Sequence, residues 1–157
     1  MASEGETQTT ASLLVEFYIK EGRTSEAKDT AKLRGRELSK EEIDSLVKNS
    51  IARGKVQGAQ EAAKLREREL SKEELDSLVK SCIRQGRTPE AQKATKLLGR
   101  ELSKEELNSL IENGIENGLF FDVEEAAKLI GRGLSNEEIE WLKETEPTSL
   151  EEYPGVF

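Results

Sequence analysis

The chain repeats itself every 32 residues, with no gap between the copies. Each copy carries a Leu-Ser pair at the same place, and the four pairs are Leu38-Ser39, Leu70-Ser71, Leu102-Ser103 and Leu134-Ser135. A fixed period in this range is typical of a solenoid, in which one supersecondary unit stacks on its neighbours. Such an array offers an extended surface, whereas an enzyme usually needs a pocket where several chain segments converge.

The first half of each repeat is predicted to form an amphipathic helix. Ser71 is followed three residues later by Glu74, which is the pattern of a capping box at a helix start. Apolar residues then recur at the helical spacing i, i+3 and i+4, at Leu75, Leu78 and Val79. The other copies of the box are Ser39/Glu42, Ser103/Glu106 and Ser135/Glu138. A glycine suited to the left-handed position after the helix occurs at Gly22, Gly54, Gly86 and Gly118.

The second half of each repeat is predicted to form a second helix. Thr88 is expected to be its N-cap with Pro89 as the first helical residue, and Asp122 is expected to cap the corresponding helix of the next repeat. Small residues on the buried face would let the two helices of a hairpin approach closely. In this copy the expected apolar face is Ala91, Ala94, Leu97, Leu98 and Leu102.

These patterns predict an all-α, right-handed α-solenoid of four 32-residue helical hairpins plus a C-terminal capping helix. The expected repeats are residues 7–38, 39–70, 71–102 and 103–134, and the capping half-repeat is 135–146. Residues 1–6 are expected to be disordered, and residues 147–157 are expected to form an irregular C-terminal tail.

Each hairpin combines four elements at fixed spacing, which in one copy are Leu78-Val79, Gly86, Glu90-Ala91 and Leu98. In these elements the unit resembles the helical hairpins of the tetratricopeptide and pentatricopeptide repeat families. The resemblance implies a concave ligand-binding face lined by the first helices. It also implies that the position that reads RNA bases in pentatricopeptide repeats falls on Ser45, Ser77 and Ser109. The usual acidic or amide partner of that position is replaced here by Lys40, Lys72 and Lys104.

Composition limits the chemistry that the chain can perform. There is no histidine, which excludes zinc sites and acid–base chemistry that depend on histidine. The single cysteine, Cys82, lies between apolar residues and is interpreted as a small core residue. No glycine-rich phosphate loop, nucleophile elbow or metal-ligand spacing occurs in the sequence. We therefore expect no enzymatic activity, no cofactor and no metal. With no leader of signal type and no apolar run near 18 residues, the expected location is cytoplasmic and no membrane is expected as a partner.

The polar flank of the first helices is the candidate binding surface for a protein or peptide. Its residues change in charge between repeats while the apolar positions keep their character, which is how a solenoid usually tunes a groove. A merely solvated face is the competing interpretation. The candidate residues are Asp44, Ser45, Lys48, Asn49, Arg53, Asp76, Ser77, Lys80, Ser81, Gln85, Asn108, Ser109, Glu112 and Asn113.

A ladder of cations on the second helices gives the alternative function, which is binding of RNA or another polyanion. The net charge is −8, but the first three repeats are mildly basic and the C-terminal part is acidic. The competing interpretation is that these cations complement helix dipoles and pair with the Glu residues of the next helix, as Arg100 would with Glu105 or Glu106. The candidate polyanion-binding residues are Lys32, Arg36, Lys64, Arg68, Lys96 and Arg100.

The sequence thus predicts a non-enzymatic helical-repeat interaction module. A protein or peptide is the expected partner, and nucleic acid is the alternative. The molecule is expected to be a monomer or to associate weakly end to end.

Overall fold

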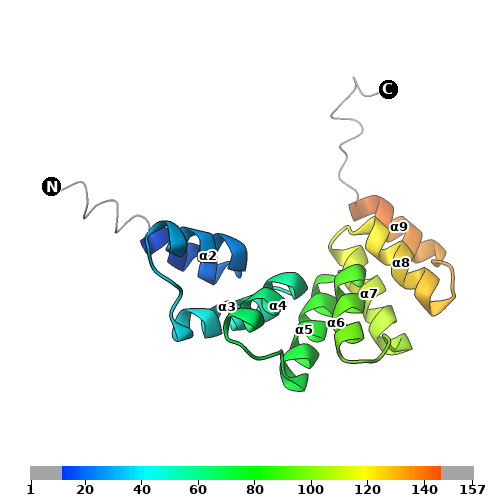
Figure 1. Ribbon diagram of the computed structural model, residues 1–157. Helices are drawn as coiled ribbons and strands as arrows, with labels where there is room; N and C mark the ends of the chain where they lie inside the picture. The colour runs from blue at the N-terminus through cyan, green and yellow to red at the C-terminus, as the bar shows by residue number, and fades with distance from the viewer. Residues whose placement is uncertain (1–11, 146–157) are drawn as a thin grey trace, which may run out of the picture. The chain divides into compact units, whose positions relative to one another are not determined.

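The computed structural model describes residues 12–145. Every regular element within this range is a helix and no strand occurs in it, so the predicted all-α fold is confirmed. Residues 12–20 are helical and form the first of the described helices. The remaining helices (Figure 1) are α2 (Thr24–Leu33), α3 (Lys40–Ala52), α4 (Val56–Leu65), α5 (Lys72–Gln85), α6 (Thr88–Leu97), α7 (Lys104–Glu116), α8 (Phe120–Ile130) and α9 (Asn136–Thr145). The predictions made for residues 1–6 and 147–157 lie outside the described residues.

The chain divides into two compact units, Met1–Ser81 and Cys82–Phe157, and the boundary between them in the sequence falls within α5. In the first unit α3 and α4 form a hairpin, and α4 packs against the preceding second helix, α2. In the second unit α7 and α8 form a hairpin, α8 packs against α6, and α9 packs against α7. First helices therefore stack on first helices and second helices on second helices, which is consistent with a helical-repeat solenoid.

The first helices begin at the predicted capping boxes. Ser39 Oγ accepts a hydrogen bond from the backbone N–H of Glu42 at 3.1 Å, and Glu42 Oε1 accepts one from the backbone N–H of Ser39 at 2.8 Å. Ser71, Ser103 and Ser135 make the same pair of bonds with Glu74, Glu106 and Glu138. Each box satisfies two backbone donors that a helix start would otherwise leave without a partner.

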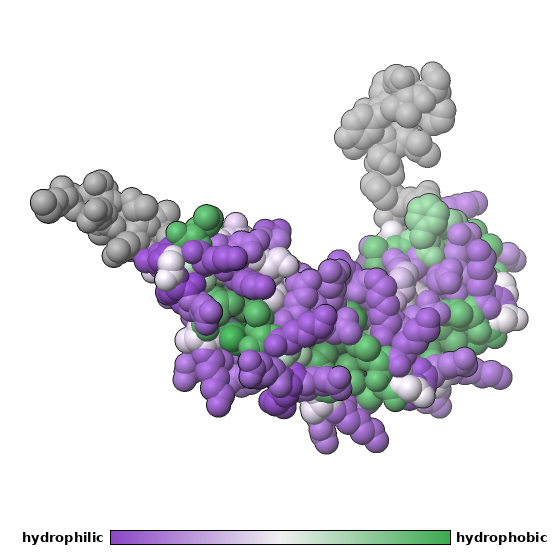
Figure 2. All heavy atoms as spheres, in the orientation of Figure 1, coloured by the Kyte–Doolittle hydropathy of each residue, from purple (hydrophilic) through white to green (hydrophobic). Residues whose placement is uncertain are grey.

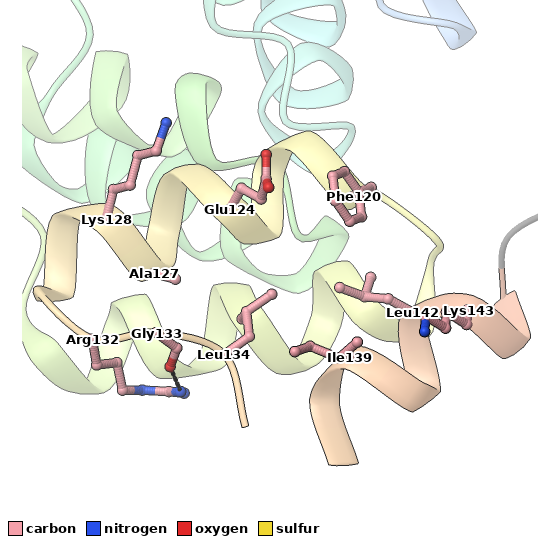
Figure 3. A pocket seen from close by; sticks show the side chains of 10 residues that line it. All are labelled: Phe120, Glu124, Ala127, Lys128, Arg132, Gly133, Leu134, Ile139, Leu142 and Lys143. Carbon is pink, nitrogen blue, oxygen red and sulfur yellow. Dashed lines mark hydrogen bonds between the residues drawn. The ribbon is translucent and has the colours of Figure 1, made fainter. Parts of the chain in front are cut away.

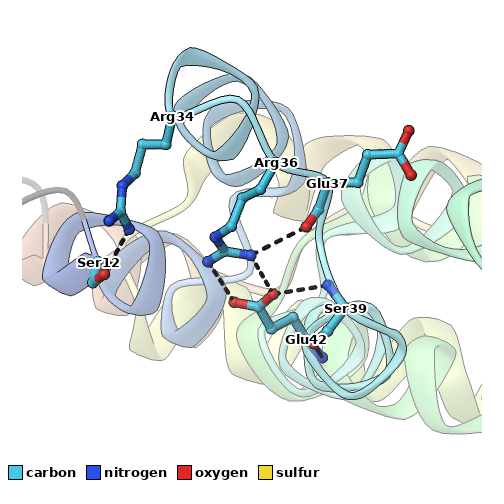
Figure 4. A network of polar contacts seen from close by, with 6 residues as sticks. All are labelled: Ser12, Arg34, Arg36, Glu37, Ser39 and Glu42. Atoms are coloured by element: carbon cyan, nitrogen blue, oxygen red, sulfur yellow. Dashed lines mark hydrogen bonds and ion pairs between the residues drawn. The ribbon is translucent and has the colours of Figure 1, made fainter. Parts of the chain in front are cut away.

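The carboxylate of each box glutamate also accepts hydrogen bonds from an arginine at the end of the preceding repeat (Figure 4). Arg36 donates from Nη1 to Glu42 Oε1 at 2.8 Å and from Nη2 to Glu42 Oε2 at 3.1 Å. Arg100 makes the same two-fold contact with Glu106, which confirms the predicted pairing and selects Glu106 over Glu105. This arginine joins the end of a second helix to the start of the next first helix.

Because of these ion pairs, we expect the stability of the protein to fall at acidic pH. Hydrogen bonds from the arginine and from the box backbone lower the pKa of Glu42, Glu74 and Glu138 to about 2. Because each folded-state pKa lies below the unfolded value of about 4.3, their contribution is complete above that pH and is lost as the pH falls toward 2. We expect the free energy of unfolding, measured by urea titration, to decline between about pH 4.5 and 2. Glu42→Gln should reduce the steepness of that decline, and an unchanged steepness in a variant lacking all three carboxylates would contradict the prediction.

The start of the second helices differs from the prediction. Their N-cap residues are Arg23, Lys55, Arg87 and Leu119, and none of these side chains makes a capping hydrogen bond. Thr88 is the first helical residue, and its buried hydroxyl donates to the carbonyl oxygen of Asp122 in the next repeat at 2.7 Å. Thr24 does the same with Gly58 at 2.9 Å. The predicted N-cap roles of Thr88 and Asp122 are therefore wrong. The Thr88 hydroxyl joins neighbouring hairpins instead, and Asp122 lies within α8, whose N-cap is Leu119.

The core consists of columns of equivalent residues. Leu46, Leu78 and Leu110 are fully buried, and Cys82 is fully buried as predicted. On the second helices the buried column is small, with Ala27, Ala59, Ala91 and Val123 fully buried. One predicted core residue is misplaced, because Leu97 is 43% exposed. Its equivalents in the first and fourth repeats, Leu33 and Leu129, are 88% and 43% exposed.

One residue departs from the repeat in backbone conformation. Glu67 has a φ of +62° at the position that Gly35, Gly99 and Gly131 occupy in the other repeats. A residue with a side chain is strained in this left-handed region by about 1–2 kcal/mol. Replacing it with glycine removes that strain, but part of the gain is offset because glycine has more conformational freedom in the unfolded chain. We expect Glu67→Gly to raise the free energy of unfolding by about 1 kcal/mol. Glu69→Gly, which removes the same charge from the same loop, controls for electrostatics and should not stabilise the protein.

Candidate interaction surfaces

Some of the predicted partner-binding residues hold neighbouring hairpins together. Asn49 Nδ2 donates to the carbonyl oxygen of Ile19 at 2.8 Å, and Asn113 Nδ2 donates to that of Ile83, also at 2.8 Å. Arg53 Nε donates to a carbonyl oxygen of the preceding turn at 3.3 Å, and Arg53 Nη1 lies 3.2 Å from a carboxylate oxygen of Glu21. The repeated asparagine, at positions 49 and 113 of the same register, was a signal in the sequence for this stacking role.

The other candidates differ in how far solvent reaches them. Ser81 is buried, at 3% exposure, while Asp44, Asp76, Gln85 and Ser109 are half-buried. The exposed candidates are Ser45, Lys48, Ser77, Lys80, Asn108 and Glu112. On α3 the structure brings Asp44, Ser45 and Lys48 together within one helical turn, and on α7 it does the same with their equivalents. These exposed positions form the polar face of the first helices that remains available to a partner.

The cation ladder is partly occupied by internal ion pairs. Arg36 and Arg100 are engaged with the capping-box glutamates, and the hydrogen bond that Arg36 donates to Glu42 raises the pKa of Arg36. Arg68 is exposed, and Arg66 takes its place by donating to the two carboxylate oxygens of Glu74 at 2.9 and 2.6 Å. The lysines of the ladder, which are Lys32, Lys64 and Lys96, are all exposed. The ladder therefore presents lysines in every repeat but has two of its three arginines neutralised.

An apolar groove lies between α8 and α9 (Figure 3) and was missed by the sequence reasoning. It encloses about 580 Å³. Figure 3 shows Leu134, Ile139 and Leu142 pointing into the space between the two helices. Figure 2 shows hydrophobic surface breaking a mostly hydrophilic exterior in several places. The groove is lined by Phe120, Glu124, Ala127, Lys128, Arg132, Gly133, Leu134, Ile139, Leu142 and Lys143.

Between residues 12 and 145 no three His, Cys, Asp or Glu side chains gather into a group that could hold a metal ion. None of the helices described there is both long enough and apolar enough to cross a bilayer.

The helical hairpins, their 32-residue register and the contacts between equivalent helices define an all-α helical-repeat protein. The chain belongs to the family described as "Repeat of unknown function (DUF1103)", which it matches over residues 6–149. This match shows a repeat protein and does not make the chain a tetratricopeptide or pentatricopeptide repeat protein. No curated protein and no solved structure matches the chain.

Proposed function

We propose that this protein is a non-enzymatic interaction module that binds a protein or peptide along the polar face of its first helices. The observation that supports the proposal is the contrast between two kinds of column. The buried column Val47, Val79 and Ile111 keeps its apolar character in every repeat. The exposed column of the same helices reads Lys48, Lys80 and Glu112, so its charge changes along the array. Stacking requires the first column to be constant and leaves the second free to match a partner.

The exposed serines of the same face support a peptide partner. Ser45 and Ser77 are exposed beside Lys48 and Lys80, and neither serine takes part in the stacking bonds described above. Short hydroxyl side chains can donate and accept hydrogen bonds, which suits the backbone of an extended peptide. Lysines one turn further along would add attraction to an acidic segment of that peptide.

The N-terminal end favours a monomer over end-to-end stacking. Gly22 and Ser50 face each other where one turn packs on the next first helix, and a Cβ on Gly22 would lie 3.1 Å from the Ser50 backbone. Ser50, Cys82 and Gly114 are small at this position, whereas the helix of residues 12–20 has Tyr18. A tyrosine is much larger than these residues, so it disfavours a preceding turn at the same distance and with it another hairpin in the same register.

Site-specific photo-crosslinking in an extract of the source organism tests the proposal. A photoreactive phenylalanine analogue placed at Ser45, Ser77 or Ser109 is expected to capture the same protein. The matched controls are Gln57 and Lys93, which are exposed on second helices and should not capture it. If the protein were captured equally from all five positions, the proposal that the partner binds specifically to the first-helix face would be wrong.

The polyanion alternative is favoured by one observation, which is the exposed lysine in each repeat. It predicts a mobility shift of mixed-sequence RNA that weakens as salt is raised. Lys32→Glu, Lys64→Glu and Lys96→Glu combined should abolish such a shift. No shift at low ionic strength would remove the alternative.

A further inference from the structure

The groove between α8 and α9 has a counterpart one repeat earlier. A smaller cavity of about 210 Å³ lies beside α6. Seven of its lining residues stand 32 positions before residues that line the groove, and they are Gln92, Thr95, Lys96, Arg100, Glu101, Leu102 and Leu107. The two spaces are therefore the same site in successive repeats.

One lining residue of the smaller cavity, a leucine, has no counterpart among the residues that line the groove. The smaller cavity is also lined by Leu129, which comes from α8, the second helix of the following repeat. Leu129 thus reaches from one repeat into the site of the repeat before it. The groove contains no such residue among the described part of the chain, since α9 is a first helix and the structure describes no second helix after it. The groove is larger than the cavity because no equivalent of Leu129 fills part of it.

This equivalence also explains the exposed leucines of the second helices. Leu33 has no earlier repeat to contact among residues 12–145 and is 88% exposed, whereas Leu129 is 43% exposed. A leucine that recurs at a partly exposed position in every repeat is consistent with a contact between repeats rather than with the core of its own hairpin.

From this we infer that the groove between α8 and α9 is a docking site for an amphipathic helix of a partner protein, which places a leucine where a following second helix would place the equivalent of Leu129. The site continues an interface that the molecule already uses between its own repeats. It is separate from the polar face of the first helices, because no exposed candidate residue of that face lines it.

The charges around the groove favour an acidic helix. Three of the ten lining residues are cations, Lys128, Arg132 and Lys143, and one is acidic, Glu124. Arg132 donates to both carboxylate oxygens of Glu138, at 2.8 and 3.1 Å, so the attraction for an acidic partner comes from the two lysines. Lys143 stands in the column where the other first helices have buried Val47, Val79 and Ile111. A helix that binds in the groove would therefore contact the ammonium group of Lys143, where the other repeats have an aliphatic side chain. An acidic residue on that helix would pair with this ammonium group.

Two helices of the chain itself supply the probe and its matched control. A labelled peptide of residues 120–130, the α8 sequence, carries Leu129 and is acidic through Asp122, Glu124 and Glu125. A peptide of residues 88–98, the α6 sequence, carries the equivalent Leu97 but is net positive. Fluorescence polarisation against the full chain should show saturable binding of the α8 peptide and weaker binding of the α6 peptide, with the difference shrinking at high salt.

Variants locate the binding and identify the contact. Leu129→Ala in the α8 peptide should weaken binding at least about tenfold, although alanine favours the helix. Ile139→Lys in the protein should have a similar effect, because Ile139 is 39% exposed at the groove and a lysine there need not disrupt folding. Leu33→Lys makes the same kind of change at an exposed leucine outside the groove and should leave binding unchanged.

Three outcomes would overturn the inference. The first is equal binding of the peptide with and without Leu129. The second is binding that begins only after removal of residues 147–157, which would make that segment the occupant of the groove. The third is a concentration-dependent dimer in sedimentation that Ile139→Lys dissolves, which would make a second copy of the chain the occupant. Because the peptide assay does not involve the first-helix face, its result is independent of the crosslinking result.

Discussion

Gly86→Ala is expected to be among the most destabilising single substitutions in this protein, lowering the free energy of unfolding by about 4 kcal/mol. A Cβ at residue 86 would lie 2.5 Å from the backbone nitrogen and 2.7 Å from the Cα of Gly114. Both of these atoms belong to the backbone of α7, so no side-chain rotation can relieve the clash. The residue also has a φ of +72°, which adds the cost of a left-handed conformation.

Gly99→Ala is the matched control for this prediction. Gly99 has nearly the same φ, +75°, but a Cβ there would have nothing within 4 Å. It should therefore cost only the conformational part, about 1–2 kcal/mol. Chemical denaturation of both variants separates the two terms. Equal losses would show that the contact between Gly86 and Gly114 does not set the distance between α7 and the turn that precedes α6.

The features that could be predicted from the sequence are those determined within a few residues. The capping boxes depend on Ser and Glu three residues apart, and Gly54, Gly86 and Gly118 adopt the left-handed conformation expected after the first helices. The burial of Cys82 followed from helical periodicity. Each of these depends on local backbone geometry or on one amphipathic face, which a single sequence records directly.

The features that were missed depend on contacts between repeats. Thr88 has the sequence pattern of an N-cap, but its hydroxyl bonds to a residue 34 positions away. Asn49 was predicted as a partner-binding residue, and the sequence did not reveal that its side chain also bonds to a carbonyl oxygen 30 positions earlier. Leu97 fits the apolar stripe of its helix but is partly exposed. The groove went unrecognised for the same reason, because its site is seen only when Leu129 is placed against the previous repeat.

A second substitution with a large expected effect concerns the second repeat. Among residues 12–145 it is the only repeat whose capping-box glutamate is bound by an arginine two positions earlier than in the others. Arg66 stands where the next two repeats have Leu98 and Ile130, and its side chain is only 6% exposed. It lies 2.6 Å from Glu74, and its Nε is buried without a hydrogen-bond partner. We expect Glu74→Ala to destabilise the protein by about 3–4 kcal/mol, because it removes a capping residue and leaves a buried guanidinium without its counter-charge.

Glu106→Ala is the matched comparison, since it removes the same capping-box residue beside Arg100, whose side chain is 42% exposed. Water can solvate that guanidinium after the substitution, so the expected cost is only about 1 kcal/mol. Arg66→Leu should by itself be nearly neutral, because it restores the residue type of the following repeats and leaves Arg68 in the register that Arg100 uses to reach its glutamate. In that background Glu74→Ala should cost about as much as Glu106→Ala does in the natural chain. If Glu74→Ala remained equally costly after Arg66→Leu, the loss would come from the helix cap, and the buried ion pair would contribute nothing specific to the second repeat.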